Sequence, residues 1–344
     1  MAGASKSFGR RLSSVAAVVV VAVLLVAIAA GAAAWWWLER PLPLAAARVE
    51  VSIEPGTTPR DVAQAWVEAG VRTSPRLLYE WFRWSGQARR IRAGSYELER
   101  GASPRELLAK MVAGDETLEK LRIGEGWTWR QLRAEIARAP HLAQTLAPLD
   151  DAQAMAAVGA PPGTSPEGRF YPDTYLYSRG VSDRVVIARA YRAMERAVAE
   201  AWAARHADSP LRSADELLTL ASIVEKETGD PGDRGFVAAV LTNRLRAGMP
   251  LQSDPTVIYG LGEAFDGNLR RRDLQQDGVY NSYTRVGLPP TPIAYPGRAA
   301  LLAAARPEPT RALYFVARGD GTSVFSETLD DHARAVNRYQ RGLR

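Results

Sequence analysis

The feature that most constrains this chain is an uncharged run of 23 residues near its N-terminus, from Val15 to Trp37. At about 1.5 Å per residue, a helix over this run is long enough to cross a hydrocarbon core of about 30 Å. Lysine and arginine precede the run, and no acidic residue occurs before Glu39. Because basic residues favour the cytoplasmic side, the sequence predicts a cytoplasmic N-terminus at 1–14, a single transmembrane helix at 15–37, and the remaining chain outside the cytoplasm.

The same run has a second interpretation, a cleavable signal peptide, because Ala30-Gly31-Ala32 is compatible with a small-residue cleavage site. The apolar region of a signal peptide is usually shorter than this run, so we favour a retained anchor. Three tryptophans at 35–37 stand where an aromatic belt at the membrane surface is expected.

Composition excludes several classes of site. The chain has 344 residues, 47% of them hydrophobic, which is enough for one or two cores, and it has no cysteine. Its only histidines, His141, His206 and His332, lack metal-ligand spacing, so we expect neither a metal nor a cofactor. No G-x-S-x-G elbow, phosphate-binding loop or basic stripe interleaved with aromatics occurs. Serine hydrolases, P-loop enzymes and nucleic-acid-binding proteins are therefore not expected.

After a linker at 38–47, one pattern occurs three times: an extended stretch, a turn and the start of a helix. The extended stretches are 48–53, 94–98 and 121–123, and each helix start pairs a capping hydroxyl with an acid or amide three residues later: Thr58 with Asp61, Ser103 with Glu106, and Thr128 with Gln131. The irregular spacing indicates a small α+β module rather than a solenoid. Such modules resemble LysM domains, which hold glycans rich in N-acetylglucosamine, so we predict a LysM-like region at 48–140. A strand-turn-helix without any glycan role remains the alternative.

The two segments that follow this region have less regular sequence patterns. Residues 141–165 are rich in alanine, proline and glycine and predict a linker. Residues 166–175 form an aromatic, proline-rich loop, which either stacks on sugar faces or packs internally. A long helix is expected at about 182–205.

The next predicted helix contains the segment 217–229, in which carboxyl groups occur among apolar residues. Ser213 and Glu216 predict a capping box at its start, and Gly229 predicts a left-handed stop at its end. On a helical wheel, Glu225 and Glu227 both fall between apolar positions. A carboxyl group kept from water has a raised pKa and can donate a proton near neutral pH. The alternative is a core helix whose acids pair with arginines.

Four strings in order carry a resemblance: A-S-I-V-E-K-E-T at 221–228, N-R-L-R-x-G-M-P-L-Q-S-D-P-T-V-I-Y-G at 243–260, Y-N-S-Y at 280–283 and G-L-P-P-x-P-I-A at 287–294. Together they closely resemble the YceG-like family of endolytic murein transglycosylases, over nearly the whole chain. One departure is Tyr295, where a smaller or amide residue is more often expected. It affects only the local loop contacts.

The resemblance implies an α+β enzyme of the bacterial inner membrane, with a periplasmic catalytic domain at 166–344. Its partners would be peptidoglycan glycan strands, the inner membrane and peptidoglycan synthases, and its activity would cut nascent strands internally and end their elongation. In that family the first glutamate of V-E-K-E-T is catalytic, which selects Glu225 over Glu227. The candidate substrate-binding residues are then Gln252, Ser253, Asp254, Asn281 and Tyr283.

The expected chemistry needs a single carboxyl group. Glu225 would protonate the glycosidic oxygen between N-acetylmuramic acid and N-acetylglucosamine. It would then accept the proton of the C6 hydroxyl of the same muramyl residue, whose oxygen closes onto the anomeric carbon to give an anhydro end. Two alternatives remain open: a noncatalytic peptidoglycan-binding scaffold, and a lysozyme-type hydrolase with Asp254 or Glu227 as its second carboxylate.

Overall fold

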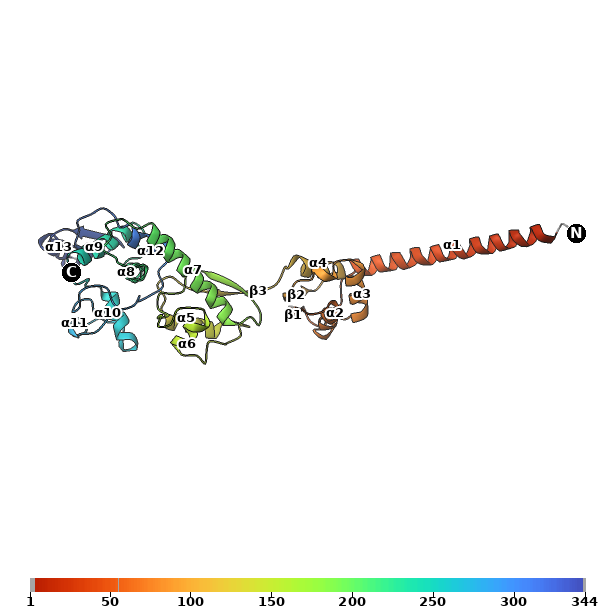
Figure 1. Ribbon diagram of the computed structural model, residues 1–344, viewed down its shortest axis with the longest axis horizontal. Helices are drawn as coiled ribbons and strands as arrows, with labels where there is room; N and C mark the ends of the chain where they lie inside the picture. The colour runs from red at the N-terminus through yellow and green to blue at the C-terminus, as the bar shows by residue number, and fades with distance from the viewer. Residues whose placement is uncertain (1–3, 55, 343–344) are drawn as a thin grey trace. The chain divides into compact units, whose positions relative to one another are not determined.

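The computed structural model describes residues 4–54 and 56–342, with side chains from residue 20 onward except at position 341. The chain divides into two compact units, unit 1 (Met1–Leu118) and unit 2 (Glu119–Arg344). The elements of unit 1 are α1 (Ala4–Glu39), β1 (Arg48–Ile53), α2 (Pro59–Glu68), α3 (Pro75–Trp84), the 3-10 turn η1 (Ala88–Arg90), β2 (Gly94–Glu99) and α4 (Pro104–Ala113) (Figure 1).

α1 is one continuous helix that contains the apolar run (Figure 1). Within its segment Val20–Glu39, the most apolar window of 18 residues has a mean hydropathy of 2.1, and no residue of that window is classed as buried. A helix of this length and composition is compatible with a single membrane span, and it is also compatible with a signal sequence. Its last turn is fixed to unit 1, because Trp37 packs against the core and the Glu39 carboxylate accepts a 2.7 Å hydrogen bond from Arg105.

The core of unit 1 lies between a small sheet and the helices that cover it. β1 and β2 pair antiparallel, with Val49 opposite Leu98 and Val51 opposite Tyr96. Alternate residues of β1 are buried, as expected for a strand with one face in the core. α2 and α3 complete the core with side chains at helical spacing, including Trp66 and Phe82.

Unit 2 begins with β3, which spans the boundary between the units. Its strands are β3 (Leu118–Arg122), β4 (Thr174–Ser178), β5 (Tyr314–Ala317) and β6 (Ser323–Ser326), and its helical elements are α5 (Trp129–Arg138), α6 (Asp151–Ala157), α7 (Asp183–Ala203), α8 (Ala214–Glu227), α9 (Arg234–Arg246), α10 (Asp254–Leu261), η2 (Gly262–Ala264), α11 (Arg271–Gln275), α12 (Arg298–Ala305), α13 (Leu329–Val336) and the π-helical turn η3 (Asn337–Arg341). β3 pairs with β4, and β5 pairs with β6. The mixture of helices and small sheets confirms the predicted fold class at this level.

α8 is the central helix of unit 2. Every residue from Leu217 to Val224 is buried, and α7, α9, α10 and α12 pack around it. A helix that is apolar on all sides is expected in such a position. The carboxyl groups at its C-terminal end therefore emerge from a tightly packed core.

Local sequence signals match the structure closely, with a few differences. Thr58, Ser103 and Thr128 are helix N-caps, and the second and third helix starts form complete capping boxes. Glu216 instead reaches past Ser213 to accept a hydrogen bond from the N–H of residue 212. The predicted stop at Gly229 is wrong: α8 ends at Glu227 because Thr228 is already extended.

The segment 141–165 contributes to the core although its composition indicates a linker. Leu142, Leu146 and Met155 are buried in a cluster with Phe170. Within the same segment lies α6, whose N-cap is Asp150. The third strand-turn-helix of the 48–140 region likewise belongs to unit 2, since the division falls after Leu118.

Candidate active site

The C-terminal turn of α8 presents Glu225 next to the start of α12. One carboxylate oxygen of Glu225, Oε2, accepts a 2.9 Å hydrogen bond from the backbone N–H of Gly297, the N-cap of α12. Burial raises the pKa of Glu225, and the neighbouring Glu125 charge raises it further, against the opposing effects of the Gly297 N–H, Arg234 and Lys226. A partly buried carboxyl group with one strong donor and a raised pKa has the properties of a general acid.

Glu125 is brought to Glu225 by a turn that sequence reasoning did not associate with the site. Gly297 lies between the two carboxyl groups: its N–H binds Glu225, and a side chain at this position would collide with the Glu125 carboxylate. The Glu125 turn is also tied to α8, because the Lys226 ammonium donates a 3.3 Å hydrogen bond to the carbonyl of Gly126. A second acidic group therefore stands beside the predicted catalytic one.

Tyr295 holds the same turn in place. Its backbone N–H donates to the carbonyl of Trp127 at 2.7 Å, and its carbonyl accepts from the N–H of Gly126 at 2.9 Å. The phenol ring is fully buried and meets Phe170 edge-on at 5.8 Å. Tyr295 thus supports the loop from within the core rather than from the surface.

Glu227 lies in a different environment from Glu225. Burial raises the pKa of Glu227 to about 7; the Asp254 charge also raises it, while Ser253 and the Arg244 guanidinium lower it. Both glutamates of the helix therefore have raised pKa values. The two carboxyl groups have different neighbours, so they belong to two separate networks.

Arg244 organises the loop that follows α9. Its buried guanidinium donates to the carbonyls of Pro250, Leu251 and Leu313, and to the side-chain oxygen of Gln252 at 2.9 Å. Gln252 has a left-handed backbone with φ of 52°. A non-glycine residue in this region is strained and is held only by its surroundings. The side chain of Gln252 is thus occupied by Arg244, which makes it part of the loop scaffold.

The other candidate binding residues form a connected group. The phenol of Tyr283 donates a 2.6 Å hydrogen bond to Asp254, the first residue of α10. Ser253 is buried and its N–H binds the hydroxyl of Ser282. The Asn281 amide donates to three backbone carbonyls, and its oxygen accepts from the N–H of Tyr283. Tyr283 and Asp254 are the members of this group with polar side chains nearest to solvent.

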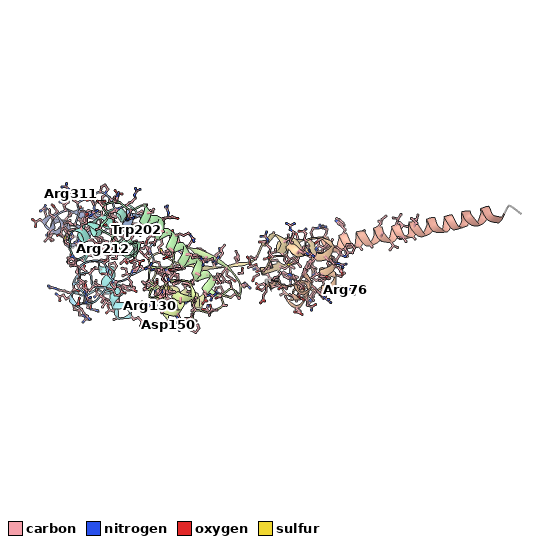
Figure 2. All side chains as sticks on the ribbon, in the orientation of Figure 1. Arg76, Arg130, Asp150, Trp202, Arg212 and Arg311 are labelled. Carbon is pink, nitrogen blue, oxygen red and sulfur yellow. The ribbon has the colours of Figure 1, made fainter. Side chains whose placement is uncertain are left out.

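A cavity of about 680 Å³ borders α8 at Lys226, the residue after Glu225. Its walls come from the first turn of α5, from α10 and from the loops after α10: Thr128, Trp129, Arg130, Gln131, Glu167, Lys226, Pro255, Ile258, Tyr259, Gly262, Phe265, Tyr280 and Ile293. Arg130, labelled in Figure 2, lies on the α5 wall. Aromatic and apolar walls with a few polar groups are typical of small-ligand sites.

Glu167 is the buried acid of this cavity. Its carboxylate accepts hydrogen bonds from the N–H of Trp129 at 3.0 Å and from the phenol of Tyr259 at 3.1 Å. Burial raises the pKa of Glu167 to about 7, against the lowering effect of these donors. Sequence reasoning treated residues 166–175 as an aromatic loop and missed this acid. The apolar neighbours that desolvate it come from distant parts of the chain, so no local pattern marks it.

No cluster of three or more potential metal ligands occurs within the described ranges 4–54 and 56–342. The polar side chains around the end of α8 are carboxyl groups, amides and hydroxyls, together with Lys226 and Arg244. The loop that carries Ile293 is fixed directly to α8, since its N–H donates to the Ser222 hydroxyl at 3.0 Å. The site is thus built around one rigid helix end.

Comparisons with known proteins agree with this architecture. The model of the YceG-like family matches residues 51–338. The endolytic murein transglycosylase of Bacillus subtilis (strain 168) is 30% identical over 85% of this chain and 84% of its own length. That of Streptococcus pneumoniae serotype 2 is 26% identical over 84% of this chain, which spans 58% of the pneumococcal protein.

A comparison with solved structures also finds a YceG-like protein. The crystal structure of a YceG-like protein from Listeria monocytogenes matches 84% of this chain and 98% of its own, with 30% sequence identity and a TM-score of 0.55. The family match covers most of the chain, including the helix that carries Glu225. The chain therefore belongs to the YceG-like family.

Proposed function

We propose that this chain is a membrane-anchored lytic transglycosylase that cuts within peptidoglycan glycan strands, with Glu225 as its acid and base. The observation that carries the proposal is the environment of Glu225, a desolvated carboxyl group at the end of the central helix with a raised pKa and one backbone donor. The names of the relatives support the reaction class. A raised pKa keeps more of this carboxyl group protonated than an ordinary glutamate, which favours proton donation to a glycosidic oxygen.

The proposed mechanism uses one carboxyl group twice, first as an acid and then as a base. Glu225 protonates the oxygen between N-acetylmuramic acid and N-acetylglucosamine, and the bond to the anomeric carbon breaks. The resulting carboxylate then removes the proton of the C6 hydroxyl of the same muramyl residue, whose oxygen bonds to the anomeric carbon. Since this hydroxyl is tethered, its effective molarity far exceeds that of a free nucleophile. The products are a free N-acetylglucosamine end and an anhydro-muramyl end.

Tyr283 and Asp254 would contact the sugars beside Glu225, while Arg244, Gln252 and Asn281 keep their loops in place. Two features support this division: the Tyr283–Asp254 pair is partly open to solvent, and the side chain of Asn281 is already saturated with hydrogen bonds. The cavity at Lys226 extends the surface available to a strand. Sugar units on both sides of the cut are what an internal cleavage requires.

Unit 1 would hold the glycan strand further along. Its order of strand, two helices and strand, with β1 and β2 antiparallel, supports the LysM-like assignment. The anchor assignment is supported by the length and composition of α1. Together these features favour an enzyme that works on strands still close to the inner membrane, next to the synthases that make them.

A second candidate function is hydrolysis, and the position of Glu125 favours it. Glycosidases that use water have two carboxyl groups, and Glu125 is the acid whose charge acts most strongly on Glu225. The Glu125 carboxyl would activate water in that mechanism. The two reactions leave different ends on the cut strand.

Digestion of purified glycan strands in heavy-oxygen water tests the proposal. Mass spectrometry of the new ends should find anhydro-muramyl residues without the label. Label in most new ends would favour the hydrolase, and unchanged strands would indicate a noncatalytic binder. Chromatography of early products tests the position of the cut, since disaccharides released from the start would mean cleavage at strand ends.

A further inference from the structure

An exposed apolar stripe runs along the outer face of α3. Leu77 is 52% exposed and Trp84 is 79% exposed, and they are seven residues apart, so they lie on the same face of the helix. Leu78 and Phe82 of the same helix are buried in the core of unit 1, so packing does not explain the second stripe. Large apolar side chains grouped on a surface indicate a binding partner.

Arginines flank this stripe. Arg76 and Arg83 are exposed and also seven residues apart. The Arg83 guanidinium lies over the ring of Trp84 at 5.6 Å and forms a 2.7 Å ion pair with Glu80, which in turn accepts a hydrogen bond from the Trp84 indole. Helices that lie in the headgroup layer of a membrane typically carry tryptophan and leucine beside arginine, as this face of α3 does.

A chain of contacts joins the stripe to the end of α1. Glu39, the last residue of α1, binds Arg105, whose guanidinium lies over the ring of Trp81 at 5.7 Å. The Trp81 indole also donates to the carbonyl of Pro104 at 3.1 Å. Trp84 follows Trp81 by three residues, a rise of about 4.5 Å along α3. Figure 2 accordingly places Arg76 at the end of unit 1 from which α1 departs.

The end of α1 has the same composition. Trp35 and Trp36 are 63% and 58% exposed, and the Arg40 guanidinium lies over the ring of Trp36 at 4.8 Å. Unit 1 is fixed to this helix end, because the N–H of Leu42 donates to the carbonyl of Ala102 and its side chain is buried. Exposed tryptophans paired with arginines thus occur on two elements of unit 1, α1 and α3.

We propose that the outer stripe of α3, formed by Arg76, Leu77, Arg83 and Trp84, lies in the lipid headgroup layer of the membrane that α1 spans. This inference rests on the proposed membrane anchoring. Continuity with the apolar helix selects a lipid surface over a protein partner, since the stripe and the end of α1 belong to one compact unit and are joined by the contacts of Glu39 and Leu42. The contact would hold unit 1 flat against the membrane and fix its orientation toward strands that emerge from that surface.

The absence of native cysteines makes a direct test simple. Full-length Trp84→Cys and Leu77→Cys, each labelled with an environment-sensitive fluorophore, are reconstituted into vesicles that contain anionic and brominated lipids. The matched control is Asp115→Cys, because α4 separates this exposed position from Arg105 by about 15 Å. Labels at 77 and 84 should show blue-shifted emission and strong quenching by the brominated lipids, and the label at 115 should show neither.

Charge removal supplies the second measurement. In the Trp84→Cys background, Arg76→Gln and Arg83→Gln should each lower the ratio of docked to undocked stripe about fivefold on anionic vesicles, the equivalent of about 1 kcal/mol per arginine. The effect should shrink on zwitterionic vesicles. If the protein floats with the vesicles but the labels at 77, 84 and 115 are quenched equally, the docking proposal is wrong and the anchor stands. The stripe would then be assigned to a protein partner. Failure of the protein to float with the vesicles would overturn the anchor and the docking proposal together.

Discussion

Replacement of Glu225 by glutamine removes the ionisable proton of the carboxyl group and keeps the size and shape of the side chain nearly unchanged. The amide has nearly the same shape, and its oxygen is able to accept the same hydrogen bond from the N–H of Gly297. The fold should therefore persist, with a change in the free energy of unfolding below about 1 kcal/mol at pH 5. Above that pH the variant should gain relative stability. A group whose pKa is raised in the folded state destabilises it once it ionises.

The expected loss of activity follows from the number of steps that need the proton. General acid-base assistance contributes about two to four orders of magnitude, or roughly 3–5.5 kcal/mol in activation free energy. In the proposed mechanism Glu225 serves both half-reactions, so Glu225→Gln should fall at the upper end of this range or beyond. The assay is the rate at which anhydro-muropeptides are released from purified glycan strands.

Glu227→Gln is the matched control, because it makes the same chemical change two residues further along α8. Its carboxyl group has Ser253, Asp254 and Arg244 as neighbours and does not share the Gly297 donor. We expect a much smaller loss of activity. Equal losses in the two variants, at equal melting temperature, would refute the assignment of Glu225 as the catalytic acid.

Three further predictions concern other charged groups of unit 2. Glu125→Gln removes a charge that raises the pKa of Glu225, so the alkaline limb of the pH–rate profile should move to lower pH; an unmoved limb would contradict the coupling. For Glu167, whose pKa is raised from 4.5 to about 7, wild-type stability should fall as pH rises through this window, by up to about 3 kcal/mol, because the folded state binds the proton more tightly; denaturant unfolding at pH 5 and pH 8 should find this slope reduced in Glu167→Gln. Arg244→Met removes the donor that holds Gln252 in its left-handed conformation, and should cost about 3 kcal/mol or more in thermal unfolding as well as raise KM; an unchanged melting temperature would show that the loop does not need this contact.

Much of the fold could be predicted because its signals are local. A capping hydroxyl such as Thr128 and an amide three residues later fix a helix start through contacts within one turn. The bounds of β1 are the predicted 48–53, since alternate residues face one core. Gly229 failed as a helix stop for a related reason: Thr228 leaves the helical conformation first, so the glycine is never needed in a left-handed one.

The environment of the candidate site was predictable only where one element carries its residues. Glu225 and Glu227 stand on one helix, and their burial follows from the apolar residues around them in sequence. Glu125 and Glu167 acquire their roles from partners far along the chain, Gly297 for the first and Tyr259 for the second. No periodicity encodes such pairings, because they depend on how loops fold back on a core.

Three other long-range contacts have a common target, the last two turns of α8. The Ser222 hydroxyl binds the loop at Ile293, Glu225 binds the N–H of Gly297, and the Lys226 ammonium binds the turn at Gly126. Each bond uses a polar side chain of the helix to fix a backbone group of a loop. A general acid must be placed to within a fraction of an ångström of the bond it protonates. The end of α8 emerges from a packed core and is bonded to three loops, so it would hold the proposed acid with that precision.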